Sequence, residues 1–401
     1  MNLPEYTSGR TNGAGKPRRV LFVDSQAELG GPGFALLTML QNLDRRLIEP
    51  VYVCITPAPA ETEAHVRAMG VPAFHIPAGR FREIRRTGQA IRALHRLIRQ
   101  QQIDAVLTNS GHPLLFARPA ALAAGRPCAW WVHGYEPRDP LRGQAIALAQ
   151  QFLQADALFA NSEITARMLV RDFPNETRIR VVRYGIDLEA HRPDPAAGLR
   201  VRNSLGIPPD EPVAGILGRL QRWKGQHIFL EAAARMTARR VACRFLVAGN
   251  SMFGLEPEYA QELRHFVEKN SLGDRVMFLG HRRDVNDVMN ACDVVVHASI
   301  EPEPWGLVVA EGMAAGRPVI ASAAGGPLEM IYHGRTGMLV PPGEARELET
   351  ALEELLRQPE RRREMGEAAR RHAVEAYDPV RAALILANGL REISVSHARS
   401  E

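Results

Sequence analysis

Short apolar runs alternate with amphipathic stretches from Val20 almost to the end of the chain. The runs have the length of strands, and the stretches between them repeat apolar residues at helical spacing. In the first half we expect strands at 19–24, 51–55, 103–108, 128–132, 157–160 and 179–182. We expect helices at 34–43, 61–69, 83–99, 114–124, 144–153 and 164–171. This alternation predicts β-α units on a parallel sheet.

The pattern breaks at residues 187–212, where five prolines surround short polar pieces, as is typical of a crossing between domains. It then restarts, with strands expected at 213–217, 244–248, 276–279, 294–298, 319–321 and 337–340. Helices are expected to begin near Lys224, Pro257, Val285, Gly306, Pro327 and Glu344, with a further helix at 360–376. We therefore predict an α/β fold of two doubly wound, Rossmann-like halves that face each other across a cleft.

The domain limits follow from this pattern. Residues 1–18 are expected to form a flexible tail, because they are polar and rich in Gly, Ser and Arg. Residues 19–190 would form the first domain, and 191–378 the second. A last helix, at about 379–396, would pack back on the first domain and complete it.

Composition changes this picture little. With 401 residues, 45% of them apolar and 24% charged, the chain has the make-up of a soluble globular protein. It lacks both an apolar run of about 18 residues and the apolar core of a signal peptide, so we expect a cytoplasmic protein. The four cysteines lie far apart, in or beside expected strands, which predicts buried thiols and neither disulfides nor zinc ligands.

The charge is more informative. The net charge of +5 suggests an anionic partner, and only three of the fifty basic residues are lysines. The stretch from Arg80 to Arg99 places apolar residues on one helical face and arginines largely off it. Such a helix either contacts an anionic membrane peripherally, at its inner face, or packs on the sheet with its arginines in solvent. We expect no nucleic-acid partner.

The segment at 299–322 carries two carboxylates, Glu303 and Glu311, on either side of a predicted helix start. A buried carboxylate such as Glu311 is costly unless donors meet it, and a sugar or ribose diol supplies donors. The free N–H groups at the helix start suit a phosphate or a sugar hydroxyl. They belong to Trp305, Gly306, Leu307 and Val308. Alternatively, the two carboxylates cap a helix and pair with arginines.

The segment at 218–225 follows the first strand of the second half. It places Arg219 at the carboxyl end of that strand, where ligands bind, and Lys224 in the first turn of the next helix. A cation at a helix start opposes the helix dipole unless an anion is held there too. The two charges could converge on one diphosphate, or form a solvated pair.

In the first half, Gly30 and Gly31 follow the first strand and permit close approach to a ligand. The dinucleotide fingerprint is incomplete, because Leu36 stands at its third glycine, and this weakens the case for a nicotinamide enzyme. His133 closes a strand at a carboxyl end, where it either contacts a sugar hydroxyl or simply caps the strand. The remaining histidines are expected mainly in helices or loops, and we expect no metal.

Together these residues resemble one family. The chain from Arg19 to Ile393 is similar to the retaining glycosyltransferases of family 4, which have the GT-B fold of two facing Rossmann-like domains. The resemblance rests on the order and spacing of these segments: Gly30-Gly31, His133-Gly134, Tyr184-Gly185-Ile186-Asp187, Gly218-Arg219, Lys224-Gly225, Glu303 with Glu311, Gly325-Gly326-Pro327-Leu328-Glu329 and Gly334-Arg335-Thr336-Gly337.

The resemblance implies a substrate, a nucleotide-diphosphate sugar linked to UDP or GDP, and no further cofactor. Arg219 and Lys224 would hold the diphosphate, and Glu311 would accept the ribose hydroxyls. Glu303 and the N–H groups that follow it would orient the donor sugar. Gly30 and Gly31 would lie near the diphosphate across the cleft. His133 would lie near the reacting sugar, and it counts with Arg219, Lys224 and Glu303 as a catalytic candidate.

The family resemblance also implies transfer with retention to an acceptor hydroxyl, in polysaccharide, glycolipid or cell-envelope synthesis. Two alternatives are a GT-B sugar-nucleotide epimerase and a nucleotide-sugar-binding protein without turnover. The chain departs from the family pattern at Tyr184, where Asn is usual, and at Trp305, where Phe is common. Pro32 to Phe34 replace a common Ala-Glu-Arg, so the acceptor stays unidentified.

Overall fold

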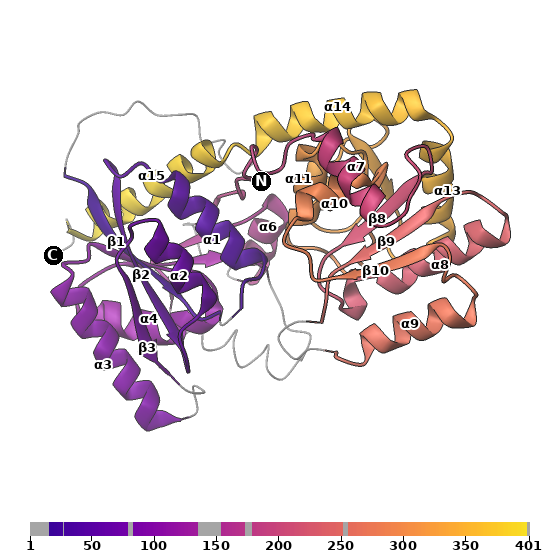
Figure 1. Ribbon diagram of the computed structural model, residues 1–401. Coiled ribbons are helices and arrows are strands. Elements are labelled where there is room, and N and C mark those ends of the chain that lie inside the picture. Colours follow the sequence, from indigo (N-terminus) through magenta and orange to yellow (C-terminus); the bar gives the residue numbers. More distant parts are fainter. Residues whose placement is uncertain are drawn as a thin grey trace.

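The computed structural model of the protein describes residues 16–26, 28–78, 83–134, 154–172, 179–251 and 256–398. Most of the expected tail and the helix expected at 144–153 lie outside these residues. The described part forms two lobes, each built on one parallel sheet (Figure 1).

The first lobe holds a seven-stranded parallel sheet in the order β3-β2-β1-β4-β5-β6-β7. Its strands are β1 (Arg18–Asp24), β2 (Ile48–Thr56), β3 (Ala73–Pro77), β4 (Ala105–Thr108), β5 (Cys128–Val132), β6 (Ala157–Ala160) and β7 (Ile179–Val181). Its helices are α1 (Gly31–Asn42), α2 (Glu61–Ala68), α3 (Ile84–Gln100), α4 (Gly111–Ala123) and α6 (Glu163–Asp172). Strand order reverses between β1 and β4, so the loops that follow these two strands flank the point where ligands of such sheets bind.

The second lobe repeats this topology in a six-stranded parallel sheet of order β10-β9-β8-β11-β12-β13. Its strands are β8 (Val213–Leu217), β9 (Arg244–Ala248), β10 (Val276–Gly280), β11 (Val294–His297), β12 (Val319–Ser322) and β13 (Gly337–Val340). Its helices are α7 (Pro195–Ser204), α8 (Gln226–Ala238), α9 (Tyr259–Lys269), α10 (Val285–Ala291), α11 (Leu307–Ala314), α12 (Pro327–Met330), α13 (Ala345–Leu356) and α14 (Pro359–Ala376). The order reverses between β8 and β11. The predicted α/β class of two doubly wound halves is therefore confirmed.

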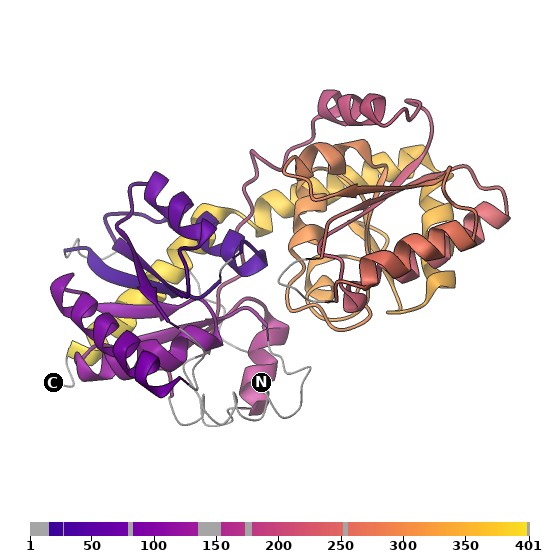
Figure 2. The ribbon, with the colours of Figure 1, turned by 60° about the horizontal axis from the view of Figure 1, so that its bottom comes forward.

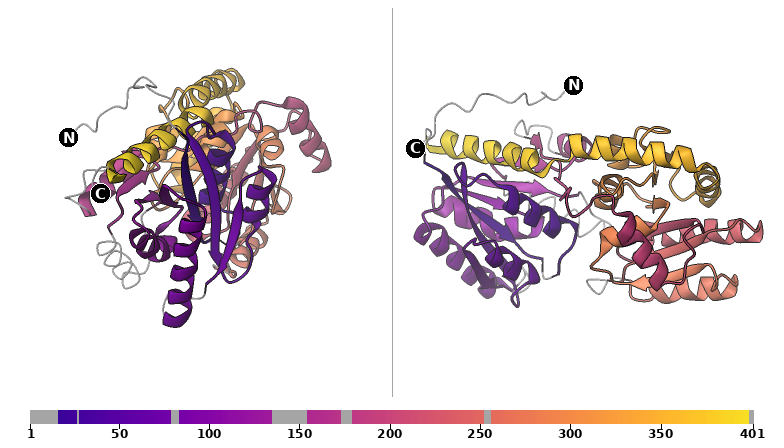
Figure 3. Two further views of the ribbon diagram at one scale, coloured as in Figure 1. Left: turned by 90° about the vertical axis from the view of Figure 1, so that its left-hand side faces the viewer. Right: turned by 45° about the horizontal axis from the view of Figure 1, so that its top comes forward.

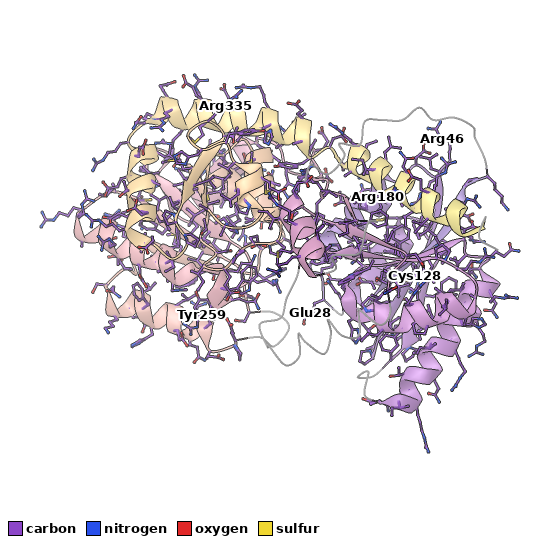
Figure 4. The ribbon with its side chains drawn as sticks, turned by 180° about the vertical axis from the view of Figure 1, so that it is seen from behind. Glu28, Arg46, Cys128, Arg180, Tyr259 and Arg335 are labelled. Carbon is purple, nitrogen blue, oxygen red and sulfur yellow. The ribbon has the colours of Figure 1, made fainter. Side chains whose placement is uncertain are left out.

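Both sheets are buried on both faces, which explains why their strands read as nearly continuous apolar runs. In β1, Val20 and Phe22 contribute to one hydrophobic cluster, while Leu21 and Val23 contribute to another on the opposite face. The four cysteines are free and buried, as predicted. Figure 4 shows one of them, Cys128, within the first lobe.

The last helix, α15 (Pro379–Ala398), crosses from the second lobe to the first (Figure 2). It continues along the same side of the molecule as α14 and packs against α1, β1 and β4 (right panel of Figure 3). Leu386 and Leu390 are fully buried there. Arg180 of β7 pairs with Glu392 of this helix, and Figure 4 shows Arg180 beside it. The last helix therefore lies against the first lobe.

Two elements were not predicted, and one local expectation was wrong. Strand β3 was not predicted, because it is a short, half-buried edge strand that ends at Pro77. The proline-rich crossing contains a helix, α7, whose Asp194 caps its start by accepting a hydrogen bond from the N–H of Ala197 (2.9 Å). Finally, Lys224 precedes α8 and does not lie in its first turn.

Candidate functional site

The loop after β8 needs two glycines to reach its position. Gly218 and Gly249, which follow neighbouring strands, have φ of +141° and +144°. A Cβ on Gly249 would overlap the carbonyl oxygen of Gly218, so the two strand ends approach closely only because Gly249 lacks one. Arg219 therefore lies at the carboxyl end of β8, where the strand order reverses.

Lys224 lies in a single 3₁₀ turn, Arg222–Lys224, that ends at Gly225. Gly225 has φ +72°, and a Cβ there would overlap the carbonyl oxygen of Ala298, just after β11. This close approach brings Lys224 from the β8 loop to the end of β11. Its ammonium lies 3.9 Å from the centroid of the Trp223 ring, a cation-π contact.

Glu303 receives Lys224 in a direct, buried ion pair between Nζ and Oε2. The same oxygen lies 3.2 Å from Nε2 of His297 and 3.4 Å from Oγ of Ser299. Ser299 Oγ also lies 3.0 Å from His297 Nε2, so the four side chains form one cluster at the carboxyl end of β11. His297 lies in β11, whereas most of the other histidines that the structure describes lie in helices and loops, as expected.

The cluster keeps Glu303 ionised. Burial alone would raise the pKa of this carboxyl, but the charge of Lys224 and the hydrogen bond with His297 more than offset it. The pKa of Glu303 is therefore held well below its usual range. A carboxylate fixed in this way acts as a hydrogen-bond acceptor, not as an acid.

The backbone around Glu303 is held by two glycines that precede α12. Gly326 donates its N–H to the carbonyl oxygen of Glu303 (2.7 Å), and Gly325 pairs with Glu303 as an isolated bridge. A Cβ on Gly325 would overlap the backbone of Glu303, and one on Gly326 would overlap that of Trp305. The Gly-Gly pair is thus required for the loop to close over the end of the sheet.

Helix α11 starts at Leu307, after Gly306 at φ +103°. Leu307 and Val308 are partly exposed, while the Trp305 side chain is buried. Glu311 is mainly buried on this helix, and its Oε1 lies 3.6 Å from Nε2 of His191. Burial raises the pKa of Glu311, and His191 partly offsets this. The helix therefore presents N–H groups at its start and a carboxyl one turn later.

In the first lobe, Gly30 caps the start of α1 and Gly31 begins it. A Cβ on Gly31 would have no described neighbour within 4 Å, so a ligand has space there. Glu28, in the same loop, lies on the side of the first lobe that faces the second (Figure 4).

His133 follows β5 as predicted, and both of its ring nitrogens are engaged. Nε2 lies 2.7 Å from Oδ1 of Asn109, and Nδ1 contacts the hydroxyl of Tyr184. The amide oxygen only accepts, so Nε2 carries the proton and Nδ1 accepts from the phenol. Burial lowers the pKa of His133 to about 3, and the ring is neutral at neutral pH.

The two lobes touch next to these groups. Tyr184 packs on Trp305, with ring centroids 4.8 Å apart, so the two residues that depart from the family pattern lie against each other. Ser162 donates to the carbonyl oxygen of Pro304 (2.9 Å). Glu329 of α12 accepts from the N–H groups of Glu163 and Ile164 at the start of α6, at 3.0 and 2.6 Å. The lobes are therefore joined by side chains from both.

The structure brings the predicted site residues Lys224 and Glu303 into contact, whereas Gly30, Gly31 and His133 lie in the first lobe. Lys224 and Glu303 form one cluster, to which sequence reasoning had not assigned His297 or Ser299. Asn109 and His191 were missed as well, because a lone Asn or His carries no signal in a single sequence. Within the described ranges, no helix is long and apolar enough to cross a bilayer, and no three His, Cys, Asp or Glu side chains group as metal ligands would.

Two family models match the chain, one to each lobe. Residues 29–190 match the model of Glycosyltransferase Family 4, and residues 200–372 match that of Glycosyl transferases group 1. The chain belongs to the group 1 glycosyltransferases of family 4. This confirms the resemblance that the motifs indicate.

Among curated relatives, the chain is similar to the D-inositol 3-phosphate glycosyltransferase of Gordonia bronchialis. The two are 34% identical over 277 residues, which is 67% of this chain and 57% of that protein. The enzyme of the same description from Mycobacterium tuberculosis is 34% identical over 272 residues, covering 67% of this chain and 53% of that protein. The chain thus spans little more than half the length of these relatives.

Solved structures agree over nearly the whole chain. HepE of Anabaena, crystallised with UDP and glucose, superposes with a TM-score of 0.81 at 26% identity, covering 93% of this chain and 99% of that one. Sucrose-phosphate synthase of Thermosynechococcus elongatus superposes with a TM-score of 0.78 at 20% identity, covering 94% and 100%. The second likeness supports the GT-B fold alone.

Proposed function

We propose that the protein transfers a sugar from a nucleotide-diphosphate sugar to an acceptor hydroxyl, with retention of configuration. The observation that carries this proposal is the buried Lys224–Glu303 pair at the end of β11, with Arg219 on the neighbouring loop. A cation and an ionised carboxylate held side by side at this sheet edge suit a donor whose diphosphate is anionic and whose sugar bears hydroxyl donors.

Each side chain then has a distinct part. Lys224 and Arg219 bind the diphosphate and stabilise the negative charge that grows on it as the glycosidic bond breaks. Glu303, kept ionised, accepts hydrogen bonds from sugar hydroxyls, and the N–H groups at the start of α11 donate to the donor. Glu311 accepts from the ribose hydroxyls. A neutral His133, with Asn109 and Tyr184, borders the sugar from the first lobe.

The acceptor attacks the anomeric carbon on the face that the diphosphate leaves, and a donor phosphate oxygen takes the acceptor proton. This route needs no nucleophile from the protein, so the charged groups only bind, orient and stabilise. It also needs no metal, because Arg219 and Lys224 supply the positive charge. Transfer should therefore continue in EDTA.

The donor is proposed to be UDP- or GDP-linked. The HepE complexes with UDP and with UDP-glucose favour the uridine nucleotide, since that protein shares the fold of this chain over 93% of its length. The acceptor binds to the first lobe, where the loop at Gly30 and Gly31 leaves space for a ligand. We propose an acceptor in polysaccharide, glycolipid or cell-envelope synthesis.

Thermal shifts with a panel of UDP-, GDP- and ADP-sugars test the donor, since a ligand stabilises the fold in proportion to the logarithm of its concentration over its Kd. One nucleotide class should shift the melting temperature of the native protein and not that of a Lys224→Ala variant. NMR of the product then reads the anomeric configuration. An inverted product would refute retention. An isomerised nucleotide sugar made without acceptor would indicate an epimerase.

We further propose that α3 makes a peripheral membrane contact. Its apolar face, including Leu94, Leu97 and Ile98, is buried against the lobe, and Arg92, Arg96 and Arg99 are exposed. Exposed arginines in a row attract anionic lipid at about 1 kcal/mol each near the surface. Flotation with phosphatidylglycerol vesicles at low salt should retain the native protein and release an Arg92→Glu/Arg96→Glu/Arg99→Glu variant. Equal flotation of both proteins would refute this contact.

A further inference from the structure

A concave site lies in the second lobe, at the opposite end of α11 from Gly306. It is a cavity of about 630 Å³ between the loop from α11 to β12, helix α14 and the segment before α7. This volume is within the range of small-molecule sites. Five arginines line it: Arg317, Arg362, Arg363, Arg370 and Arg371.

The two carboxylates of the lining are already paired. Asp293 lies 2.8 Å from the guanidinium of Arg202, outside the lining, and Glu367 lies 2.5 Å from that of Arg363. Among the residues that the structure describes, no carboxylate lies within 4 Å of Arg317, Arg370 or Arg371. The lining therefore carries an excess of positive charge.

Three of these arginines, Arg317, Arg362 and Arg370, are only partly exposed to solvent. Arg317 donates to Oδ1 of Asn290 (3.2 Å), but its Nε is buried and has no hydrogen-bond partner among the described residues. Burial lowers the pKa of both Arg317 and Arg370, which means that each guanidinium lacks full compensation for lost solvent. An anion in the cavity would supply that compensation.

We propose that this cavity binds the phosphate group of a small soluble molecule. Guanidinium groups hold phosphate through paired N–H donors in a fixed fork, and arginines that line a cavity without a carboxylate partner are suited to this. The arginines surround a cavity of small-molecule size and are not spread over a flat face, which favours a soluble ligand over a membrane surface.

The cavity is connected to the proposed donor site. Arg370 donates through Nη1 to the carbonyl oxygens of His191 (3.0 Å) and Ala314 (2.8 Å). The ring of the same His191 lies 3.6 Å from Glu311, the proposed ribose acceptor. An anion that draws Arg370 toward itself weakens the hydrogen bond of Arg370 to the His191 carbonyl. It thereby acts on His191, the partner of Glu311. This connection rests on the proposed function, whereas the binding site itself does not.

Calorimetry with inorganic pyrophosphate tests the site. The native protein is first titrated with UDP, which measures donor binding separately, and the UDP-saturated protein is then titrated with pyrophosphate at constant ionic strength. Saturation of the donor site keeps pyrophosphate from binding there. We expect one further site, weakened at least tenfold in Arg317→Gln and Arg371→Gln and unchanged in Arg346→Gln, an exposed arginine outside the lining.

Absence of pyrophosphate binding, or equal affinity in the native protein and both cavity variants, would overturn the proposal. Flotation with phosphatidylglycerol vesicles separates the two sources of phosphate: weaker flotation of Arg371→Gln than of Arg346→Gln would assign a lipid headgroup instead. UDP affinity measured with and without pyrophosphate tests the connection. We expect it to change in the native protein and not in Arg317→Gln, and an unchanged affinity would refute the link through His191.

Discussion

Replacing Lys224 by Met should destabilise the fold as well as abolish transfer. The Lys224 and Glu303 side chains are only 19% and 11% exposed, so the substitution leaves a buried carboxylate without its cation. Breaking a buried ion pair by removing one partner costs about 3–5 kcal/mol. His297 and Ser299 remain as hydrogen-bonding neighbours of Glu303, so we expect the lower end, about 3 kcal/mol.

The loss should depend on pH in a defined direction. In the native protein the folded-state pKa of Glu303 lies below its unfolded value, so the stability that it contributes is present above about pH 4.5 and is lost as the pH falls further. Without Lys224, the pKa of Glu303 should rise, because burial disfavours the charged form and the cation that offsets it is gone. The variant then avoids part of its penalty when Glu303 is protonated, and its deficit against the native protein shrinks in acid.

Urea unfolding at pH 7.5 and pH 4 measures both effects. The double variant Lys224→Met/Glu303→Gln should recover at least half of the lost stability, because neither charge remains, yet stay inactive. Lys269→Met removes an exposed lysine from the same lobe and serves as the matched control. A stability loss for Lys224→Met no larger than that of Lys269→Met, or no recovery in the double variant, would refute the reasoning.

Three further predictions concern other parts of the molecule. Burial raises the pKa of Asp24 to about 6, so ionisation of this carboxyl above that pH destabilises the fold. Asp24→Asn should therefore raise the unfolding free energy at pH 8 by up to about 3 kcal/mol, measured as a higher melting temperature, and should have little effect at pH 4. Leu386→Ala on α15 should cost about 2–5 kcal/mol in urea, whereas Leu384→Ala, 38% exposed on the same helix, should cost far less. Transfer should survive dialysis against EDTA, and a complete loss restored by Mg²⁺ or Mn²⁺ would refute the metal-free route.

Among the strands that the structure describes, only β3 was not predicted from the sequence. Central strands such as β1 and β8 are apolar on both faces and carry a strong signal over few residues. The edge strand β3 is half-buried and includes His75, so its pattern resembles a loop. Helix α7 was hidden among prolines, although Pro195 at its first position is compatible with a helix start.

The sequence singled out individual candidate residues of the proposed donor site, but not the contacts between them. Arg219, Lys224 and Glu303 stand in the loops that follow β8 and β11, which the alternation of strands and helices locates well. The contact between Lys224 and Glu303 depends on Gly225 lying against Ala298, a meeting of loops that no local pattern shows. For the same reason His297 was missed, since its role comes from Glu303, six residues further along the chain.

Binding of nucleoside diphosphates tests the central claim most directly. Calorimetric titration of the native protein with UDP and with GDP should show saturable binding of one nucleotide at one site per chain. In an Arg219→Ala/Lys224→Ala variant that site should be weakened at least a hundredfold, or about 2.7 kcal/mol. Absence of saturable binding of either nucleotide, or equal affinity in the variant, would contradict a donor site at the carboxyl ends of β8 and β11.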